Sequence, residues 1–189
     1  GNYPTGSNNV ALGDTALDSI TSNNNTAIGS GAATSTAGGY SNVALGYLAL
    51  QDNVTGFQNV AVGELALGDN TGAQNIAVGF NAMRLNTSGQ FNTAIGYQGL
   101  YSNTTASNNT AVGYQAAYAN TTGTLTAFGE GTLKANTTGA ANVAVGGSLP
   151  GTANAALRLN TTGNYNTGIG TGALGSNTTA SENTAVGCQ

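Results

Sequence analysis

The sequence carries very little charge and has no histidine and no tryptophan. Of its 189 residues 5% are charged, three of them basic and seven acidic, whereas soluble domains carry about 25% charged residues. Without histidine the chain has no Ser-His or Cys-His relay and no imidazole metal ligand. The three basic residues, Arg84, Lys134 and Arg158, are too few for the phosphate-tracking groove that nucleic acid binding requires.

Cysteine, proline and long apolar runs are also scarce. Cys188 is the single cysteine, so it cannot form an internal disulfide, an interchain bond stays open, and the composition does not indicate a redox compartment. No segment approaches the length of a membrane span, and no signal peptide is recognisable. The apolar 39% is mostly alanine with Val, Leu and Ile, which predicts a thin core.

What the sequence does have is a repeat. The five-residue motif Asn42-Val-Ala-Leu-Gly46 recurs eleven times, once as the degenerate Leu125-Thr-Ala-Phe-Gly129. The motif glycines are spaced by 16 or 17 residues, except for a spacing of 24 between Gly146 and Gly170. We expect the seven surplus residues, around 147–153, to form a surface loop in a single repeat domain that spans residues 1–189.

The motif alternates bulky and small side chains, which is the periodicity of a β-strand. A unit of 16 to 17 residues has no room for a crossover helix, so each strand is expected to pair in parallel with its equivalent one repeat away. The sequence therefore predicts an all-β fold, a parallel β-solenoid or β-roll of about eleven rungs.

The small face of the strand, Ala and Gly, fits the interior of a narrow roll. The bulky fourth position of the motif would then form an exposed apolar stripe, and such stripes mark interfaces. We expect this stripe to face the axis of a homo-oligomer, and the alternative is a wider monomeric solenoid whose core takes these residues. The stripe consists of Leu12, Ile28, Leu45, Val62, Val78, Ile95, Val112, Phe128, Val145, Ile169 and Val186.

Aromatic residues recur directly after the motif glycine. They are Tyr47, Phe80, Tyr97 and Tyr114. Packing at a corner of the coil is the simpler interpretation of this row, and contact with sugars or with a neighbouring subunit is the alternative.

Two further patterns have simple explanations. Nine Asn-x-Ser/Thr sequons arise from the repeat, and we interpret them as turns in which Asn and Thr bond the local backbone, with glycosylation as the alternative. They begin at Asn24, Asn53, Asn86, Asn103, Asn108, Asn120, Asn136, Asn160 and Asn177. The acidic residues do not form a calcium loop, and the three that share the position after the motif glycine, Asp14, Glu64 and Glu130, lie on distant coils, so we expect no metal, no cofactor and no catalytic site. The acidic residues are Asp14, Asp18, Asp52, Glu64, Asp69, Glu130 and Glu182.

The motif Asn42-Val-Ala-Leu-Gly46 and its counterparts resemble the YadA-like head repeats of trimeric autotransporter adhesins, and the related repeats in tail fibres and structural proteins of tailed phages. The resemblance implies a left-handed parallel β-roll, three chains around a common axis, and a surface that binds host matrix or other cells. This repeat departs from the adhesin pattern in its longer unit and its Asn-Thr-Thr-Gly turns.

We therefore expect a rigid segment of a fibre or adhesin, extracellular or on a virion surface, that contributes to attachment to a host glycan or protein. Because the chain begins and ends within the repeat pattern, we expect it to be part of a longer protein. A self-assembling extracellular filament and an ice-binding solenoid are the alternatives. Nucleic acid binding, membrane insertion and enzymatic activity are not expected.

Overall fold

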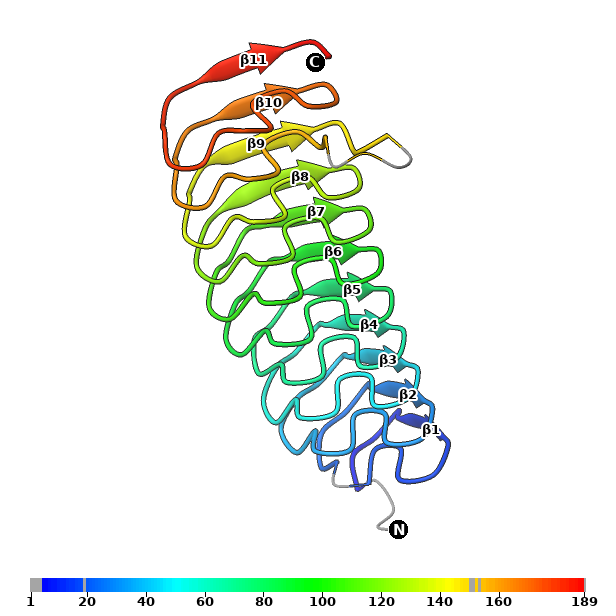
Figure 1. Cartoon of the computed structure of the whole chain (residues 1–189). Coiled ribbons are helices and arrows are strands. Elements are labelled where there is room, and N and C mark those ends of the chain that lie inside the picture. Colours follow the sequence, from blue (N-terminus) through cyan, green and yellow to red (C-terminus); the bar gives the residue numbers. More distant parts are fainter. Residues whose placement is uncertain (1–4, 19, 150–151, 153, 189) are drawn as a thin grey trace.

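The computed structural model describes residues 5–18, 20–149, 152 and 154–188. One short strand forms in each repeat, and successive coils stack into a rod (Figure 1). The strands are β1 (Val10–Leu12), β2 (Thr26–Ile28), β3 (Val43–Leu45), β4 (Val60–Val62), β5 (Ile76–Val78), β6 (Thr93–Ile95), β7 (Thr110–Val112), β8 (Leu125–Phe128), β9 (Asn142–Val145), β10 (Thr167–Ile169) and β11 (Thr184–Val186).

All eleven strands belong to one sheet in sequence order, and every neighbouring pair is parallel. The register places equivalent motif residues opposite one another, as in the pairing of Ala44 with Ala61 and of Leu45 with Val62. The prediction of an all-β parallel solenoid is confirmed.

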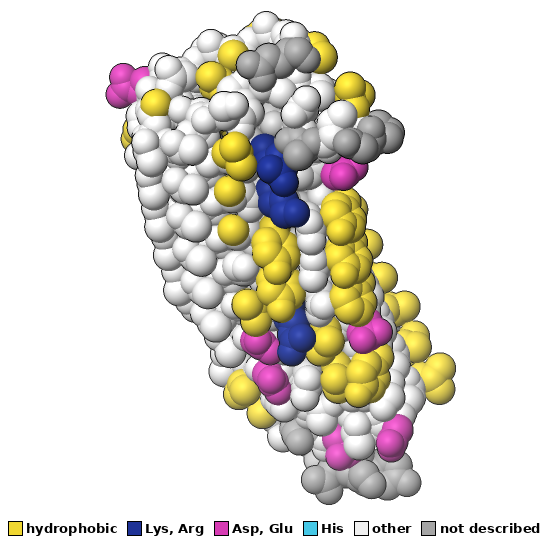
Figure 2. All heavy atoms as spheres, in the orientation of Figure 1, with side chains coloured by type: hydrophobic (Ala, Val, Ile, Leu, Met, Phe, Trp, Pro, Cys, Tyr) yellow, Lys and Arg dark blue, Asp and Glu magenta, His cyan; other side chains and the backbone are white. Residues whose placement is uncertain are grey.

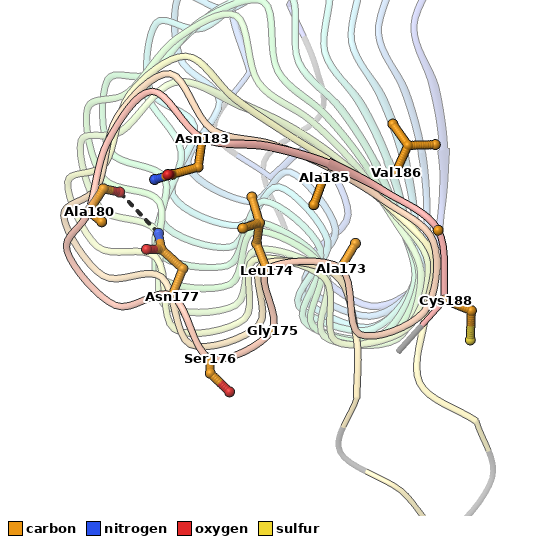
Figure 3. Close-up of a pocket in the computed structure, with 11 residues that line it drawn as sticks. Ala173, Leu174, Gly175, Ser176, Asn177, Ala180, Asn183, Ala185, Val186 and Cys188 are labelled. Atoms are coloured by element: carbon orange, nitrogen blue, oxygen red, sulfur yellow. Dashed lines mark hydrogen bonds between the residues drawn. The ribbon is translucent and has the colours of Figure 1, made fainter.

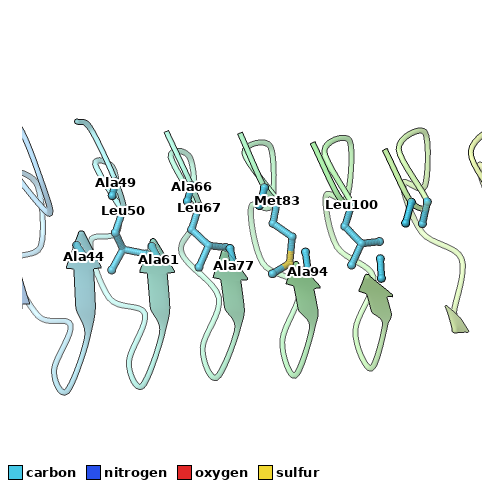
Figure 4. Close-up of a cluster of buried hydrophobic side chains, with 14 of the residues drawn as sticks. Ala44, Ala49, Leu50, Ala61, Ala66, Leu67, Ala77, Met83, Ala94 and Leu100 are labelled. Carbon is cyan, nitrogen blue, oxygen red and sulfur yellow. The ribbon is translucent and has the colours of Figure 1, made fainter. Parts of the chain in front are cut away.

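The motif alanine at the centre of each strand points into the coil and is almost fully buried along most of the stack, as Ala44, Ala61 and Ala94 illustrate. The opposite wall of the interior is a column of mostly leucines, such as Leu50 and Leu67, with Met83 on one coil and alanine on two others (Figure 4). Burial of one such side chain contributes about 1.5–3 kcal/mol. The core is as thin as the alanine-rich composition predicts.

The other half of the interior is polar and contains two columns of asparagine. In the first, which we call the motif ladder, the side-chain oxygen of each motif asparagine accepts the backbone N–H of the next one. The Asn59 N–H, for example, donates to Asn42 Oδ1 at 2.9 Å, and the Asn75 N–H donates to Asn59 Oδ1 at 2.9 Å. The Asn59 amide also donates to the Gly72 carbonyl at 2.9 Å, so both ends of the buried side chain have partners.

The second column, the turn ladder, runs through the Asn-Thr-Thr-Gly turns. Each amide donates to the side-chain oxygen of the asparagine one coil earlier, as Asn103 does to Asn86 Oδ1 at 2.7 Å. The same amide closes its own turn by donating to a carbonyl three residues ahead, here that of Ala106 at 3.0 Å. These bonds satisfy polar groups that would be costly to bury unpaired.

The motif ladder also explains the length of the strands. The motif has five residues but most strands have three, because the motif asparagine N–H bonds a side chain and leaves the regular sheet pattern. At β8 the asparagine is replaced by Leu125, and the Asn142 N–H bonds the Thr124 carbonyl instead, at 3.4 Å. Strands β8 and β9 are accordingly one residue longer, and Asn109 Nδ2 is buried without a partner.

The corner after each strand requires glycine. Gly113 has a φ of +137°, and a Cβ there would lie 2.6 Å from the carbonyl carbon of Gly129 on the next coil. An L-residue would be strained at this φ, and it would also overlap the neighbouring main chain.

Beyond the glycine the chain turns through left-handed residues that are not glycine. Leu48 and Leu50 have φ values of 53° and 55°, a conformation that costs an L-residue about 1–2 kcal/mol. Their N–H groups point to opposite neighbours, since Leu48 bonds the Ser30 carbonyl and Leu50 bonds the Ala66 carbonyl. Each coil is thereby tied to the coils on both sides of it, which offsets the strain.

The surplus residues enter between the motif glycine of β9 and the alanine that follows the corner, where the chain leaves the stack (Figure 1). The Ala156 N–H still donates to the Gly146 carbonyl at 2.9 Å, which is the equivalent of the bond from Ala49 to Gly46. The insertion therefore does not interrupt the coil. Residues 150, 151 and 153 of the predicted loop lie outside the described residues.

Substitution of Gly113 by alanine is expected to lower the free energy of unfolding by more than about 2 kcal/mol, because strain and overlap act together. Gly38 is the matched control, since its φ is not in the left-handed region and a Cβ there would meet only the Val54 carbonyl oxygen, at 3.6 Å. Gly38→Ala should change stability by no more than about 0.5 kcal/mol. Urea denaturation of the two variants tests this, and equal stabilities would contradict the proposed role of the corner.

The change Asn103→Leu is expected to destabilise the coil by about 3 kcal/mol or more, because it leaves buried ladder groups unpaired on both sides. The matched control is Asn154→Leu at an exposed position of the insertion, where a change within about 0.5 kcal/mol is expected. Thermal unfolding followed by circular dichroism compares the two. A tolerated Asn103→Leu would show that the turn ladder does not hold the coils together.

Candidate functional site

The eleven residues of the predicted stripe lie on the outer surface of the sheet, and we call them the outer stripe. At the C-terminal end Ala185 points into the coil while Val186 points away from it (Figure 3). Side chains of the outer stripe are exposed or half-buried throughout, with Ile95 in the middle of the rod at 41% exposure. They take no part in the core of this single chain.

The second position of the motif also faces outward, so the sheet presents two neighbouring columns. Val10 and Ile76 are exposed, and Val43, Val60 and Thr93 are half-buried. The sheet surface is therefore a continuous strip of branched apolar residues and threonines, and it contains no charged residue from β1 to β11.

The predicted aromatic row is only partly continuous. Phe80, Tyr97 and Tyr114 stack on successive coils, with ring centroids 5.2 Å apart and planes within 13°. We call these three residues the first aromatic column. Tyr47 stands apart from them, because Glu64 occupies the equivalent position on the coil between Tyr47 and Phe80.

A second column lies four residues further along each coil. It consists of Arg84, Tyr101, Tyr118, Lys134 and Arg158. Backbone hydrogen bonds connect these coils in order, from Leu85 to Tyr101, from Ser102 to Tyr118, from Ala119 to Lys134 and from Ala135 to Arg158. Tyr101 and Tyr118 stack at 5.2 Å. All three cations of the chain belong to this cationic column.

Sequence reasoning missed the cationic column although the signal was present. Its members are spaced by 17, 17, 16 and 24 residues. The first three spacings are those of the motif glycines from Gly79 to Gly129, and the last is the spacing of 17 from Gly129 to Gly146 lengthened by the seven surplus residues. Because we treated the basic residues as a total and the tyrosines as one row, their shared repeat position was not recognised.

Amide side chains lie between the two columns on the same corner. Gln115 donates to Gln98 Oε1 at 2.8 Å, and Asn81 holds the equivalent position one coil earlier. Asn81 is 7% exposed, and its Oδ1 is buried without a partner, as is Arg84 Nε on the same coil.

The amide row ends at Gly131, and a hollow of about 80 Å³ opens there. It is lined by Tyr114 of the first aromatic column, by Glu130, by Lys134 and Arg158 of the cationic column, and by Ser148 and Thr152 of the insertion. Figure 2 shows the two hydrophobic columns running side by side along the rod, with basic side chains at both ends of one of them. No ion pair connects the acidic and basic side chains of the described residues.

Most of the sequon asparagines are buried members of the turn ladder, and only a few lie at the surface. Asn53, Asn86, Asn103, Asn120, Asn136 and Asn160 are fully buried, and their amides close the turns and bond the neighbouring coils. Asn24 and Asn108 are exposed, and Asn177 is half-buried. The turn interpretation therefore has direct structural support at the six buried positions, where a glycan could not be attached to the folded coil.

The first threonine of most turns uses its hydroxyl group inside the stack. Thr87 Oγ1 donates to the Thr104 carbonyl at 3.0 Å, and Thr121 Oγ1 donates to the Thr137 carbonyl at 3.0 Å. These hydroxyl donors are engaged with the next coil, whereas the second threonine of the same turns, as at Thr105, Thr122 and Thr138, is exposed.

A hollow of about 530 Å³ at the C-terminal end is lined by residues such as Leu174, Asn177 and Ala185, which form the open end of the core (Figure 3). Within the described ranges no three His, Cys, Asp or Glu side chains gather as a metal site.

The described residues contain no helix that is long and apolar enough to cross a membrane. Comparison of the chain with models of protein families, with curated proteins and with solved structures finds no match.

Proposed function

We propose that this chain is a rigid segment of a trimeric fibre or adhesin, extracellular or on a virion surface, which supports attachment to a host or another surface. The observation that carries the proposal is the outer stripe, an uncharged apolar column that follows all eleven strands. An apolar surface of this length is typical of a site covered by another protein.

The hydrogen bonds between successive coils are those expected of a rigid rod. Each coil contacts its neighbours through main-chain pairing, through the motif ladder and through the turn ladder. In such a stack, stability is the sum of nearest-neighbour contacts, so the rod resists bending through many equivalent bonds. This property supports a function as a spacer or shaft more than one that depends on a movable lid or cleft.

The trimer follows from the outer stripe together with the resemblance to YadA-like repeats. In three parallel copies, each sheet would turn its stripe towards a common axis and bury it against two equivalent stripes. Removal of this apolar surface from water would provide the association free energy, at about 25 cal/mol per Å². The absence of charged residues from the strands avoids like-charge repulsion between the copies.

The test is the mass in solution by light scattering, for which we expect about three times the chain mass of 18.5 kDa. The change Ile95→Lys should dissociate the assembly, because it places several ammonium groups in the buried interface. Leu159→Lys is the matched control, since both residues are 41% exposed but Leu159 lies outside the outer stripe. A wild-type monomer, or equal masses for the two variants, would refute the trimer through this face.

A further inference from the structure

The cationic column places like charges at equivalent positions on neighbouring coils, as Asp52 and Asp69 do on another pair of coils. Equivalent positions on successive coils lie about 4.8 Å apart, and like charges at that spacing are destabilising. Lys134 and Arg158 nevertheless occupy the same position on neighbouring coils, with no ion pair to a described carboxylate. A bound anion would relieve this repulsion.

The surroundings of these cations favour a sugar over a simple ion. The hollow beside them is also lined by Tyr114, Gln115 and Glu130. Aromatic rings offer an apolar surface to the C–H groups of a pyranose, while amide and carboxylate groups accept hydrogen bonds from its hydroxyls. The ring centroids are 5.2 Å apart, beyond the 3.5–4.0 Å of a direct face contact, so the rings are offset and each leaves part of a face uncovered.

The direction of the two columns and the spacing of the coils match the geometry of a linear glycan. Both columns run along the rod, and the spacing of the coils is close to the repeat of an extended pyranose chain. A linear glycan aligned with the rod would therefore meet a tyrosine, an amide or a cation at successive sugar units.

We propose that the face between the first aromatic column and the cationic column binds an extended acidic glycan. A uronic acid carboxylate pairs with Lys134 and Arg158, the hydroxyls bond Gln115 and Glu130, and the sugar rings lie against Tyr114 and Tyr118. The proposal does not depend on the trimer, because the outer stripe occupies the strands and this face occupies the corner that follows them.

The experiment is calorimetric titration of the wild-type protein with an oligogalacturonide, and with the same oligosaccharide after methyl esterification of its carboxylates. Binding of the acidic form and at least about tenfold weaker binding of the ester are expected, because hydrogen bonds to charged groups are the strong ones. No binding of the acidic form, or equal binding of the ester, would overturn the proposal.

Variants locate the site. The double change Lys134→Gln with Arg158→Gln, and separately Tyr118→Ala, should each weaken binding by about tenfold or more. Tyr40→Ala is the matched control, since Tyr40 stacks on Phe57 at 5.0 Å in a different part of the coil, and it should bind as the wild type does. Equal affinities for Tyr118→Ala and Tyr40→Ala would overturn the assignment.

Mass and thermal unfolding of each variant separate this result from the oligomer. Loss of binding with unchanged mass and melting temperature supports a glycan site. A fall in mass in Tyr118→Ala would instead identify the columns as a contact between protein chains and would overturn the proposal. The variant Ile95→Lys should bind the oligogalacturonide as the wild type does, whatever its mass.

Discussion

Every coil except the one that carries Leu125 is bound to the next by a motif asparagine whose side chain accepts a main-chain hydrogen bond, and the other regularities of the fold depend on this contact. The bond from the Asn59 N–H to Asn42 Oδ1 spans 17 residues, and the bond from the Asn75 N–H to Asn59 Oδ1 spans 16, yet both measure 2.9 Å. The difference in length is absorbed in the turn, where Asn70-Thr-Gly72 is one residue shorter than Asn53-Val-Thr-Gly56. The position of the motif asparagine relative to the next coil is therefore constant, and the number of residues in the coil varies between 16 and 17 without changing it.

A buried ladder of neutral amides also accounts for the composition. A carboxylate at the same position would be buried without a counter-charge, which is far more costly than burial of a hydrogen-bonded amide. The motif alanine and the corner glycine are constrained by the close approach of the next coil, as at Gly113. Inside the coil only a few residue types are acceptable, so variation between coils is confined to positions that point outward. The outer columns are where one coil differs chemically from the next.

The parts of the fold that depend on period and alternation could be predicted from the sequence. Strand positions, parallel pairing and the inward alanine all follow from the spacing of the motif glycines and from the alternation of Asn-Val-Ala-Leu-Gly. The left-handed conformation of Leu48 and Leu50 could not be predicted, because intrinsic preference disfavours it and only the bonds to both neighbouring coils make it acceptable. The burial of the turn asparagines could not be predicted either, because the sequence indicated turn residues that bond the local backbone but not that these side chains lie inside the coil. For the surface, the repeat position of Arg84 and Tyr101 mattered more than the number of basic or aromatic residues.

The two outer surfaces differ in how far they extend. The outer stripe keeps its apolar character on every strand, as a contact with an equally long parallel partner would require. The cationic column and the first aromatic column are confined to the coils between β5 and β10, and glutamates, Glu64 and Glu130, occupy the positions before and after the first aromatic column. A change of outward-facing side chains on a few coils does not affect how the remaining coils stack. Those coils can therefore carry a binding surface while the rod stays intact. The outer stripe, which is uniform along the rod, suits assembly with other chains, whereas the two columns, which are local, suit recognition of a ligand. The outer stripe lies on the strands, and the columns lie on the corner that follows them.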